Sequence, residues 1–386
     1  MNSAYDIYAS SKEAWNAMYK TIGQAKKSIY WEMYTFADDE AGKEFFDLLE
    51  KKSLEGLDVK LIVDSWGTFW FPKKRRQSLK AAGVDILFFQ ERKRRYRGMW
   101  LRLISRTHRK ILVVDEQVGF IGGVNVQKNM EAWLDIHVKI EGKVVRSLLR
   151  SFAKMYIICG GAKENVRHLM KYQFRLFKDK IEFVYDDAHS RDSMTRQKYI
   201  EAFLKAREHI ILFSPYYIPD KDFLKALWNA RKRGVRIDLL IPFRTDLRLV
   251  TYAAYFLFDL MQKFGVKIFL VKQMMHGKGI VVDDDWAMVG SSNLEHTSFY
   301  DSYEANVKIK DREFVKNVKE KLETWMKDAG ELKQEDWQKR GAWHRLKEKT
   351  AYKIYALWHR RTQTKIYEEY PDSSFIPKSD APRDSE

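Results

Sequence analysis

Short apolar runs alternate with helix-period segments along the first half of the chain. A strand-like run begins at residue 25 and reaches Phe36, and an amphipathic segment follows near 41–53. A second apolar run covers 56–64, and the turn at 82–86 leads into a third. Buried strands separated by helices are typical of βαβ units with a mostly parallel sheet. The pattern therefore predicts an α/β fold for this half.

The same order of elements returns in the second half. An apolar run at 206–217 precedes a helical segment near 222–231, a second apolar run at 234–241 and a turn at 264–268. Any two α/β segments could share one such match, but two matches in the same order indicate an internal repeat. We therefore expect two repeated units, each a mostly parallel sheet flanked by helices.

The composition of the chain suggests where these units end. We expect the first unit at about 1–178 and the second at about 179–332, joined by a partly helical connection at 160–179. The remaining segment, 333–386, is a basic and aromatic C-terminal extension. Its end, from Pro371, has the composition of a disordered segment.

Each predicted unit carries the same group of polar residues after its strands. In both, His-x-Lys is followed by aspartate seven residues after the histidine and by asparagine seventeen residues after it. These residues are His108, Lys110, Asp115 and Asn125 in the first unit, and His276, Lys278, Asp283 and Asn293 in the second. On a strand, the histidine and the lysine point to the same face, so an imidazole and an ammonium converge.

The asparagine can donate a hydrogen bond to a phosphate oxygen, and the small residues before it permit close approach of the backbone to a ligand. A single copy of the motif would fit an ordinary buried histidine equally well. Two copies in register within a repeat predict one shared site.

The doubled motif resembles the signature of the phospholipase D superfamily, which is His-x-Lys-x4-Asp twice. The resemblance covers nearly all of residues 20–330, and within the superfamily the bacterial cardiolipin synthases are most similar. The segments that carry this closer likeness are 38–43, 122–125, 290–294 and 304–307. Many of these enzymes begin with two membrane helices, and this chain resembles the short forms that lack them.

The resemblance implies a single central active site, shared by both units, and adds two acidic residues to it. These are Asp135 and Glu304, which follow the motif histidines of their own units by 27 and 28 residues. A carboxylate on the far nitrogen of an imidazole fixes its tautomer and stabilises the imidazolium. The family also implies that Asp115 and Asp283 brace the catalytic site and do not touch phosphate.

A phosphodiester is an anion, which the two motif lysines would neutralise while Asn125 and Asn293 bind its oxygens. One histidine would attack phosphorus, and the other would protonate the departing alcohol and then activate the acceptor. The resemblance favours His108 as the nucleophile and His276 as the acid and base. It implies a phosphatidyltransferase of phospholipid biosynthesis that makes cardiolipin and glycerol from phosphatidylglycerol.

The charge and composition of the chain limit the kinds of binding partner that we expect. The 386 residues carry a formal net charge of +17, which suits an anionic membrane, a nucleic acid or a phosphorylated substrate. A solvated basic surface would give the same charge. The single cysteine, Cys159, excludes an intramolecular disulfide, and no histidine has the spacing of a known metal motif. We expect no cofactor and no metal.

The sequence favours attachment to a membrane surface over insertion. The N-terminus has no apolar signal-like region, and the longest apolar stretch, 249–261, is too short to span a bilayer. The stretch at 91–107 is basic, and the tail at 333–361 has apolar residues at helical spacing: Trp343, Leu346, Thr350, Ile354, Leu357 and Trp358. This tail fits an interfacial helix, or a helix packed on the domains. We expect a peripheral protein on the cytoplasmic side of the cell membrane, with an anionic phospholipid substrate and no obligate protein partner.

The alternative is a phospholipase D-type phosphodiesterase or nuclease with the same catalytic residues. Basic residues interleaved with aromatic ones also suit single-stranded nucleic acid. The segments that resemble lipid synthases and the helix pattern of the tail argue against this alternative, so no nucleic-acid partner is expected. A binding protein without activity is disfavoured because both motifs are intact.

Overall fold

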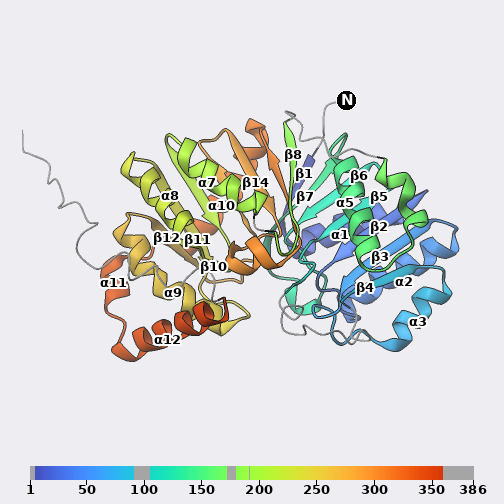
Figure 1. Ribbon diagram of the computed structural model, residues 1–386, viewed down its shortest axis with the longest axis horizontal. Coiled ribbons are helices and arrows are strands. Elements are labelled where there is room, and N and C mark those ends of the chain that lie inside the picture. Colours follow the sequence, from blue (N-terminus) through green and yellow to red (C-terminus); the bar gives the residue numbers. More distant parts are fainter. Residues whose placement is uncertain (1–4, 91–104, 172–179, 191, 360–386) are drawn as a thin grey trace, which may run out of the picture.

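The computed structural model describes residues 5–90, 105–171, 180–190 and 192–359 (Figure 1). Most of the basic stretch at 91–107, part of the predicted connection and the end of the extension from residue 360 lie outside the described residues.

The first unit is built on a seven-stranded sheet in the order β1-β7-β6-β5-β2-β3-β4. The strands are β1 (Tyr5–Ser10), β2 (Ser28–Met33), β3 (Asp58–Asp64), β4 (Asp85–Phe89), β5 (Ile111–Val114), β6 (Val118–Gly122) and β7 (Leu134–Glu141). Its helices are α1 (Ser11–Gly23), α2 (Glu40–Leu54), α3 (Lys73–Ala81), α5 (Val145–Ile158) and the short α6 (Arg167–Met170). Strand β2 is buried along its whole length, as its apolar run predicts.

The second unit repeats this order strand for strand, in the sheet β8-β16-β14-β13-β9-β11-β12. The strands are β8 (Ile181–Asp186), β9 (His209–Phe213), β11 (Arg236–Pro242), β12 (Lys267–Val271), β13 (Gly279–Val282), β14 (Trp286–Gly290) and β16 (Glu304–Ile309). The helices are α7 (Met194–Lys205), α8 (Lys221–Lys232), α9 (Arg248–Lys263) and α10 (Arg312–Ala329), and the short strands β10 (Tyr217–Ile218) and β15 (Leu294–Glu295) form a separate pair. The predicted repeat and the α/β class are therefore confirmed.

The expectation of mostly parallel sheets is wrong in detail, because each sheet is mixed. The βαβ part of each unit is parallel, from β2 to β4 and from β9 to β12. The motif strands β5 and β13 pair antiparallel with both of their neighbours. The physical reason lies in the connections: only a tight turn, residues 115–117, separates β5 from β6, and such a turn can join only antiparallel strands.

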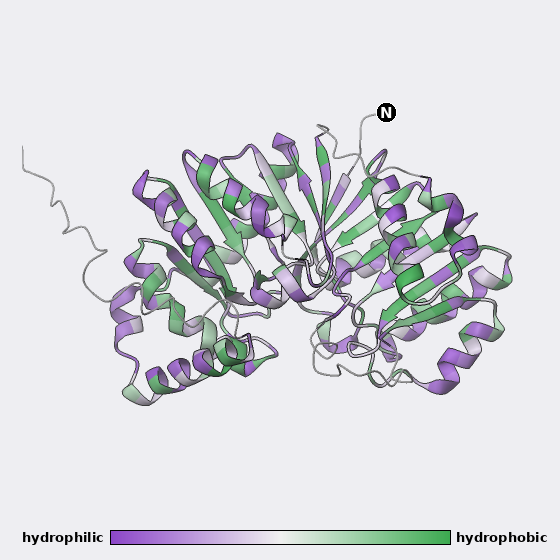
Figure 2. Cartoon of the chain, in the orientation of Figure 1, coloured by the Kyte–Doolittle hydropathy of each residue, from purple (hydrophilic) through white to green (hydrophobic). Residues whose placement is uncertain are grey.

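A shared apolar core joins the two units. It contains Ile121 and Val138 from the first sheet and Val289 and Val307 from the second, and helices α5 and α10 pack against it. Figure 1 shows the two units side by side with β7 and β14 near the middle, and Figure 2 shows hydrophobic strands within more hydrophilic helices. Because the units meet along these strands, the loops at the motif ends of the two sheets come together. We propose that the first unit ends at residue 178 and the second at residue 332.

The described part of the C-terminal extension forms α11 (Gln334–Gln338) and α12 (Ala342–Trp358). Helix α12 packs on α9 through Ala351, Tyr352 and Tyr355. The apolar residues at helical spacing lie on its other face: Trp343, Leu346, Ile354, Leu357 and Trp358 are exposed. The helix is therefore packed on the domains through one face, and its other face is exposed. No helix in the described ranges combines the length and apolar character that crossing a bilayer requires.

Candidate active site

The two histidine motifs meet at the boundary between the units. Each motif histidine precedes its strand, since β5 begins at Ile111 and β13 begins at Gly279. The backbone N–H of His108 donates to the carbonyl of Tyr303 at 3.0 Å, and that of His276 donates to Leu134 at 2.6 Å. Each motif is thus hydrogen-bonded to the residue that precedes the acid of the opposite unit. This pairing aligns each imidazole with a carboxylate from the other half of the chain.

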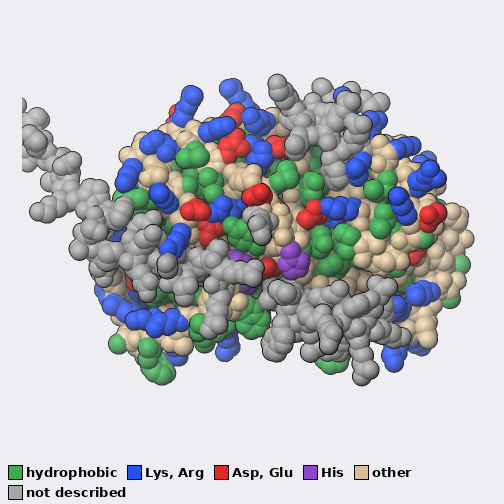
Figure 3. Space-filling model, in the orientation of Figure 1, with side chains coloured by type: hydrophobic (Ala, Val, Ile, Leu, Met, Phe, Trp, Pro, Cys, Tyr) green, Lys and Arg blue, Asp and Glu red, His purple; other side chains and the backbone are tan. Residues whose placement is uncertain are grey.

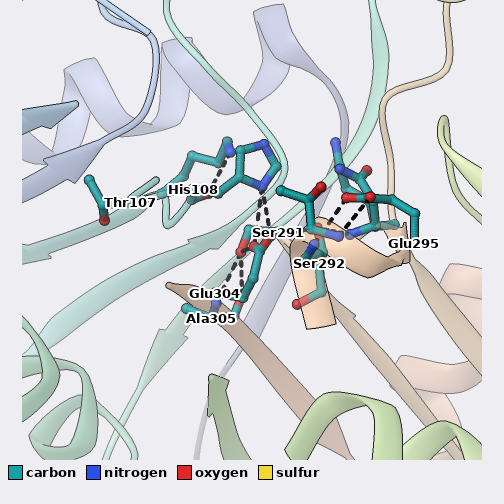
Figure 4. A network of polar contacts seen from close by, with 12 residues as sticks. Thr107, His108, Ser291, Ser292, Glu295, Glu304 and Ala305 are labelled. Carbon is teal, nitrogen blue, oxygen red and sulfur yellow. Dashed lines mark hydrogen bonds and ion pairs between the residues drawn. The ribbon is translucent and has the colours of Figure 1, made fainter. Parts of the chain in front are cut away.

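The two imidazole–carboxylate pairs cross between the units. Nδ1 of His108 lies 3.0 and 3.2 Å from the two carboxylate oxygens of Glu304, as Figure 4 shows. Nδ1 of His276 lies 2.9 Å from Oδ2 of Asp135. The sequence predicted all four residues but did not say which acid meets which imidazole. Because Nδ1 is engaged in both pairs, Nε2 is the ring nitrogen left for chemistry.

Glu304 accepts more side-chain hydrogen bonds from the described residues than Asp135 does. It accepts further hydrogen bonds from the hydroxyls of Ser291 and Ser298, the latter at 2.7 Å. Burial alone would raise the pKa of Glu304, but the charge and hydrogen bond of His108, together with Lys110, outweigh it and lower that pKa. Burial raises the pKa of Asp135, against the opposing charge of Lys278. The two carboxylates thus differ in how firmly they hold a negative charge.

The two motif lysines lie buried beside the histidines. Their Nζ atoms donate to the carbonyls of His108 and His276, the first at 2.6 Å. Burial lowers the pKa of Lys278 to about 8. Burial and the nearby charge of Lys278 lower that of Lys110 well below its usual value. Two ammonium groups in one dry site disfavour each other, so a bound anion would stabilise both.

The same environment lowers the pKa of both imidazoles. Burial, followed by the charges of Lys278 and Lys110, lowers the pKa of His276 well below its usual value. Burial also lowers the pKa of His108, although the charge of Glu304 opposes the shift. A bound phosphodiester would offset the lysine charges and raise both histidine pKa values. Binding an anion and taking up a proton are therefore coupled in this site.

The two motif asparagines differ in their contacts. Oδ1 of Asn125 accepts a hydrogen bond from the backbone of Thr35 at 3.2 Å. The buried Oδ1 of Asn293 has no hydrogen-bond partner among the described residues. From the sequence, we expect the small residues before these asparagines to let the backbone approach a ligand closely. The structure gives another reason at Gly123, where a Cβ would overlap the carboxylate of Asp135.

The motif aspartates lie at the far ends of the motif strands. Asp115 accepts hydrogen bonds from the backbone N–H groups of residues 26–28, and Asp283 accepts from those of residues 207–209. Both adopt positive φ, 54° and 50°, in the turn that follows the strand. Seven residues at about 3.3 Å each separate them from the histidines, so these two side chains position the strands and do not reach the imidazoles.

Aromatic side chains that the motifs do not include line the site. The ring of Tyr34 meets that of His108 edge-on, with centroids 4.9 Å apart, and Trp133 lies 5.3 Å from His276. Tyr216, after β9, donates its hydroxyl to Asp246 at 2.6 Å. Tyr34 follows β2 and Tyr216 follows β9, but the register of the two repeats matches Tyr34 with Pro215, so aligning the repeats residue by residue would not have found this pair. Figure 3 shows histidine at the surface near the middle of the molecule, with lysine and arginine spread around it.

Known proteins resemble this chain over most of its length. The family model described as "Cardiolipin synthase, PLD-like domain" matches residues 18–156 and 199–326, one stretch in each unit. A protein named cardiolipin synthase from Clostridium perfringens is 30% identical over 358 residues, which cover 89% of this chain and 74% of the relative. Cardiolipin synthase B from Escherichia coli K12 is 31% identical over 326 residues, covering 82% and 78%.

Two solved structures share the fold. A phosphatidylserine synthase from Haemophilus influenzae aligns with a TM-score of 0.71 at 16% identity, over 92% of this chain and 93% of that one. A polyphosphate kinase from Porphyromonas gingivalis aligns with a TM-score of 0.56 at 12% identity, over 83% and 46%. At such identities the likeness concerns the fold alone. With the family match in both repeats, this chain belongs to the phospholipase D-like family of cardiolipin synthase domains and is a phospholipase D-type phosphatidyltransferase.

Proposed function

We propose that this enzyme makes cardiolipin from two molecules of phosphatidylglycerol through a phosphohistidine on His108. The observation that carries the proposal is the crossed pair: two imidazoles, each held at Nδ1 by a carboxylate, beside two buried lysines. The names of the relatives supply the substrate class. A chain with these groups can hold an anionic phosphodiester and supply both a nucleophile and an acid.

In the first step, Nε2 of His108 attacks phosphorus and forms a phosphorus–nitrogen bond. The bond from phosphorus to the oxygen of the headgroup glycerol breaks, and Nε2 of His276 gives its proton to that oxygen. The headgroup leaves as free glycerol, and the phosphatidyl group stays on His108. Lys110 and Lys278 neutralise the non-bridging oxygens. Glu304 keeps its charge and stabilises the imidazolium that forms at His108.

The second step is the reverse of the first, with a different alcohol in place of glycerol. The acceptor hydroxyl of another phosphatidylglycerol passes its proton to His276 and attacks phosphorus, and the phosphorus–nitrogen bond breaks. Cardiolipin leaves, and both imidazoles return to their starting state. Water in place of the acceptor would give phosphatidic acid, so the proposal requires that the alcohol enters in preference to water.

Mass analysis of products tests the reaction. Purified enzyme with phosphatidylglycerol vesicles in excess chelator should give cardiolipin and glycerol, and single-stranded DNA should remain intact. With a donor whose leaving group needs no proton, His276→Ala should accumulate phosphohistidine at His108, whereas His108→Ala should form no adduct. Label on His276 in the His108→Ala protein would reverse the assignment, and cleavage of DNA without lipid turnover would replace the lipid function with a nuclease.

We further propose that the enzyme docks on an anionic membrane through two exposed aromatic groups, one on the C-terminal extension and one on the first unit. On α12, Trp343 and Trp358 are 65% and 67% exposed, and in the turn between β3 and α3, Trp70 is 87% exposed. Figure 1 places α12 and α3 along the same lower edge of the molecule. Basic residues on both helices suit anionic headgroups, each contributing about 1 kcal/mol near the surface.

Sedimentation with vesicles tests this attachment. The variant Trp343→Glu/Trp358→Glu should bind phosphatidylglycerol vesicles more weakly, and high salt should release part of the wild-type protein. Leu204→Glu, at an exposed leucine on α7, is the matched control and should bind as the wild type does. Equal binding of all three proteins, or equal binding to neutral vesicles, would contradict the docking surface.

A further inference from the structure

Outside the catalytic pairs, a second group of titratable side chains joins the C-terminal helix to the segment that precedes Glu304. His296 precedes the helical turn Thr297–Asp301 and Asp301 ends it, and His359 follows α12. Nδ1 of His296 lies 3.2 Å from Oδ2 of Asp301, and Nδ1 of His359 lies 3.9 Å from the same oxygen. Two imidazoles from distant parts of the sequence thus face a single carboxylate.

The geometry of this group is that of an open metal site. One candidate ligand atom from each residue lies within 4.8 Å of the others, and the two imidazole rings lie side by side with centroids 4.8 Å apart. Tetrahedral zinc with bonds of about 2.0–2.1 Å needs ligand atoms about 3.4 Å apart. The two measured nitrogen–oxygen distances, 3.2 and 3.9 Å, lie on either side of that separation.

The surroundings also suit a bound cation. The side chains of His359, His296 and Asp301 are only 7%, 12% and 21% exposed. A proton on both imidazoles would bring two positive charges into contact, and a proton on one would balance the carboxylate but leave the second ring facing an imidazolium. A divalent cation balances the carboxylate while both imidazoles stay neutral and act as its ligands.

We propose that His296, Asp301 and His359 form a binding site for a divalent cation of the zinc type. Two nitrogen ligands and one oxygen ligand match the preference of this ion and leave a fourth position for water. The catalytic imidazoles are engaged with their own carboxylates, so the cation has a structural role and takes no part in phosphoryl transfer.

The consequence is a fixed connection between α12 and the active site. Tyr355 on α12 donates to Glu295 at 2.5 Å, and Glu295 accepts the backbone N–H of Ser298 at 3.0 Å. The hydroxyl of Ser298 in turn donates to Glu304. Figure 4 shows Glu295 on the side of this network away from His108. A cation at the nearby cluster would hold the turn that carries Ser298 and so add to the contacts with His108 and Ser291 that already position Glu304 without it.

Zinc titration of the full-length chain, prepared with a tag free of histidine and stripped by a chelator, tests the site. The wild type should bind one zinc ion, and at a hundredfold excess over the dissociation constant zinc should raise the apparent Tm by about 3 °C. Loss of a residue that hydrogen-bonds to a metal ligand weakens metal binding roughly 10–100-fold, so loss of a ligand itself in His359→Gln or Asp301→Asn should weaken it roughly 100-fold. Each variant is compared with its own zinc-free form, so a change in basal stability does not obscure the shift.

Three further variants locate the ion. His344→Gln, on the exposed side of α12, should bind zinc as the wild type does. The double variant His108→Ala/His276→Ala should also retain the ion, since the catalytic imidazoles are not its ligands. Asp301→Cys should keep the site and give a thiolate-to-metal charge-transfer band with cobalt(II). Absence of saturable binding in the wild type, unchanged affinity in His359→Gln, or loss of the ion in the double variant would each overturn the proposal.

Discussion

Replacing Glu304 by glutamine isolates the role of the carboxylate at His108. The change keeps the size of the side chain and removes its charge. The carboxylate lies 3.0 and 3.2 Å from Nδ1 of His108 and accepts from two serine hydroxyls. As an acceptor only, it requires hydrogen on Nδ1 and leaves Nε2 with a lone pair. The amide of glutamine can donate to Nδ1 instead, which would move the hydrogen to Nε2 and block attack on phosphorus.

The size of the effect follows from tautomer control. In serine proteases, the corresponding change of aspartate to asparagine lowers kcat by about 10⁴ through the wrong tautomer. The serine hydroxyls around Glu304 can rotate to accept from an amide, so the buried site tolerates the substitution. We therefore expect kcat to fall by roughly 10³–10⁴, which corresponds to about 4–5 kcal/mol of transition-state stabilisation, with a smaller change in KM.

Rapid-quench labelling with an activated donor separates this role from that of the acid at the other imidazole. Glu304→Gln should abolish the burst of phosphohistidine, whereas Asp135→Asn, which affects the acid and base, should keep the burst and slow its breakdown. Glu348→Gln is a matched control, because Glu348 is a buried acid that pairs with Arg340 and not with an imidazole. If Glu304→Gln retained a burst within about tenfold of the wild-type rate, tautomer control by Glu304 would be refuted.

Three other predictions follow from the same contacts. Gly123→Ala should lower kcat at least roughly tenfold in a folded protein, because its Cβ overlaps the carboxylate of Asp135 and displaces it; wild-type turnover would contradict the packing argument. Affinity for phosphate or vanadate, measured by calorimetry, should fall as the pH rises through about 8, because Lys278, whose pKa burial lowers to about 8, loses its charge there; no fall in affinity between about pH 8 and pH 10 would contradict its role. Asp115→Ala should lower the free energy of unfolding in urea by about 1–3 kcal/mol, through loss of its backbone hydrogen bonds, and leave kcat within about tenfold; a loss of kcat comparable to that of His108→Ala would make the aspartate catalytic.

The residues that the structure brings together at the candidate site could be predicted from sequence because their spacing is local and occurs twice. His108 and Lys110 are two residues apart and Asn125 lies a fixed distance beyond, so one unit alone defines its half of the site. Which acid serves which imidazole could not be predicted. Offsets of 27 and 28 residues fit pairing within a unit as well as pairing across units. The choice depends on how the two sheets pack, which is a contact between distant parts of the chain.

Other parts of the structure escaped the sequence interpretation for different physical reasons. The mixed sheets follow from the tight turn after Asp115, a signal that was present but that the βαβ pattern obscured. Strand β1 and helix α1 lie in a segment whose polar residues hide a buried face, formed by residues such as Trp15 and Met18. For helix α12, the spacing located the helix, but its two faces could be distinguished only once α9 was seen beneath one of them.

The crossed pairs also suit the two different catalytic roles that we propose for a nearly symmetric fold. Neither unit completes its own site, because each supplies an imidazole to one half and a carboxylate to the other. The halves then differ in their acids. Glu304 receives two serine hydroxyls besides His108, and its pKa is lowered, so it remains charged and can balance a cationic phosphoimidazole.

Asp135 bonds to the backbone N–H of Ile136, and burial raises its pKa. Its partner His276 has the more strongly lowered pKa and so the weaker hold on a proton in the free site. A group that gains its proton only when an anion is present, and releases it readily when glycerol departs, is suited to acid and base work. The difference between one glutamate with two serine donors and one aspartate bonded to its own backbone thus supports attack by His108 and proton transfer by His276.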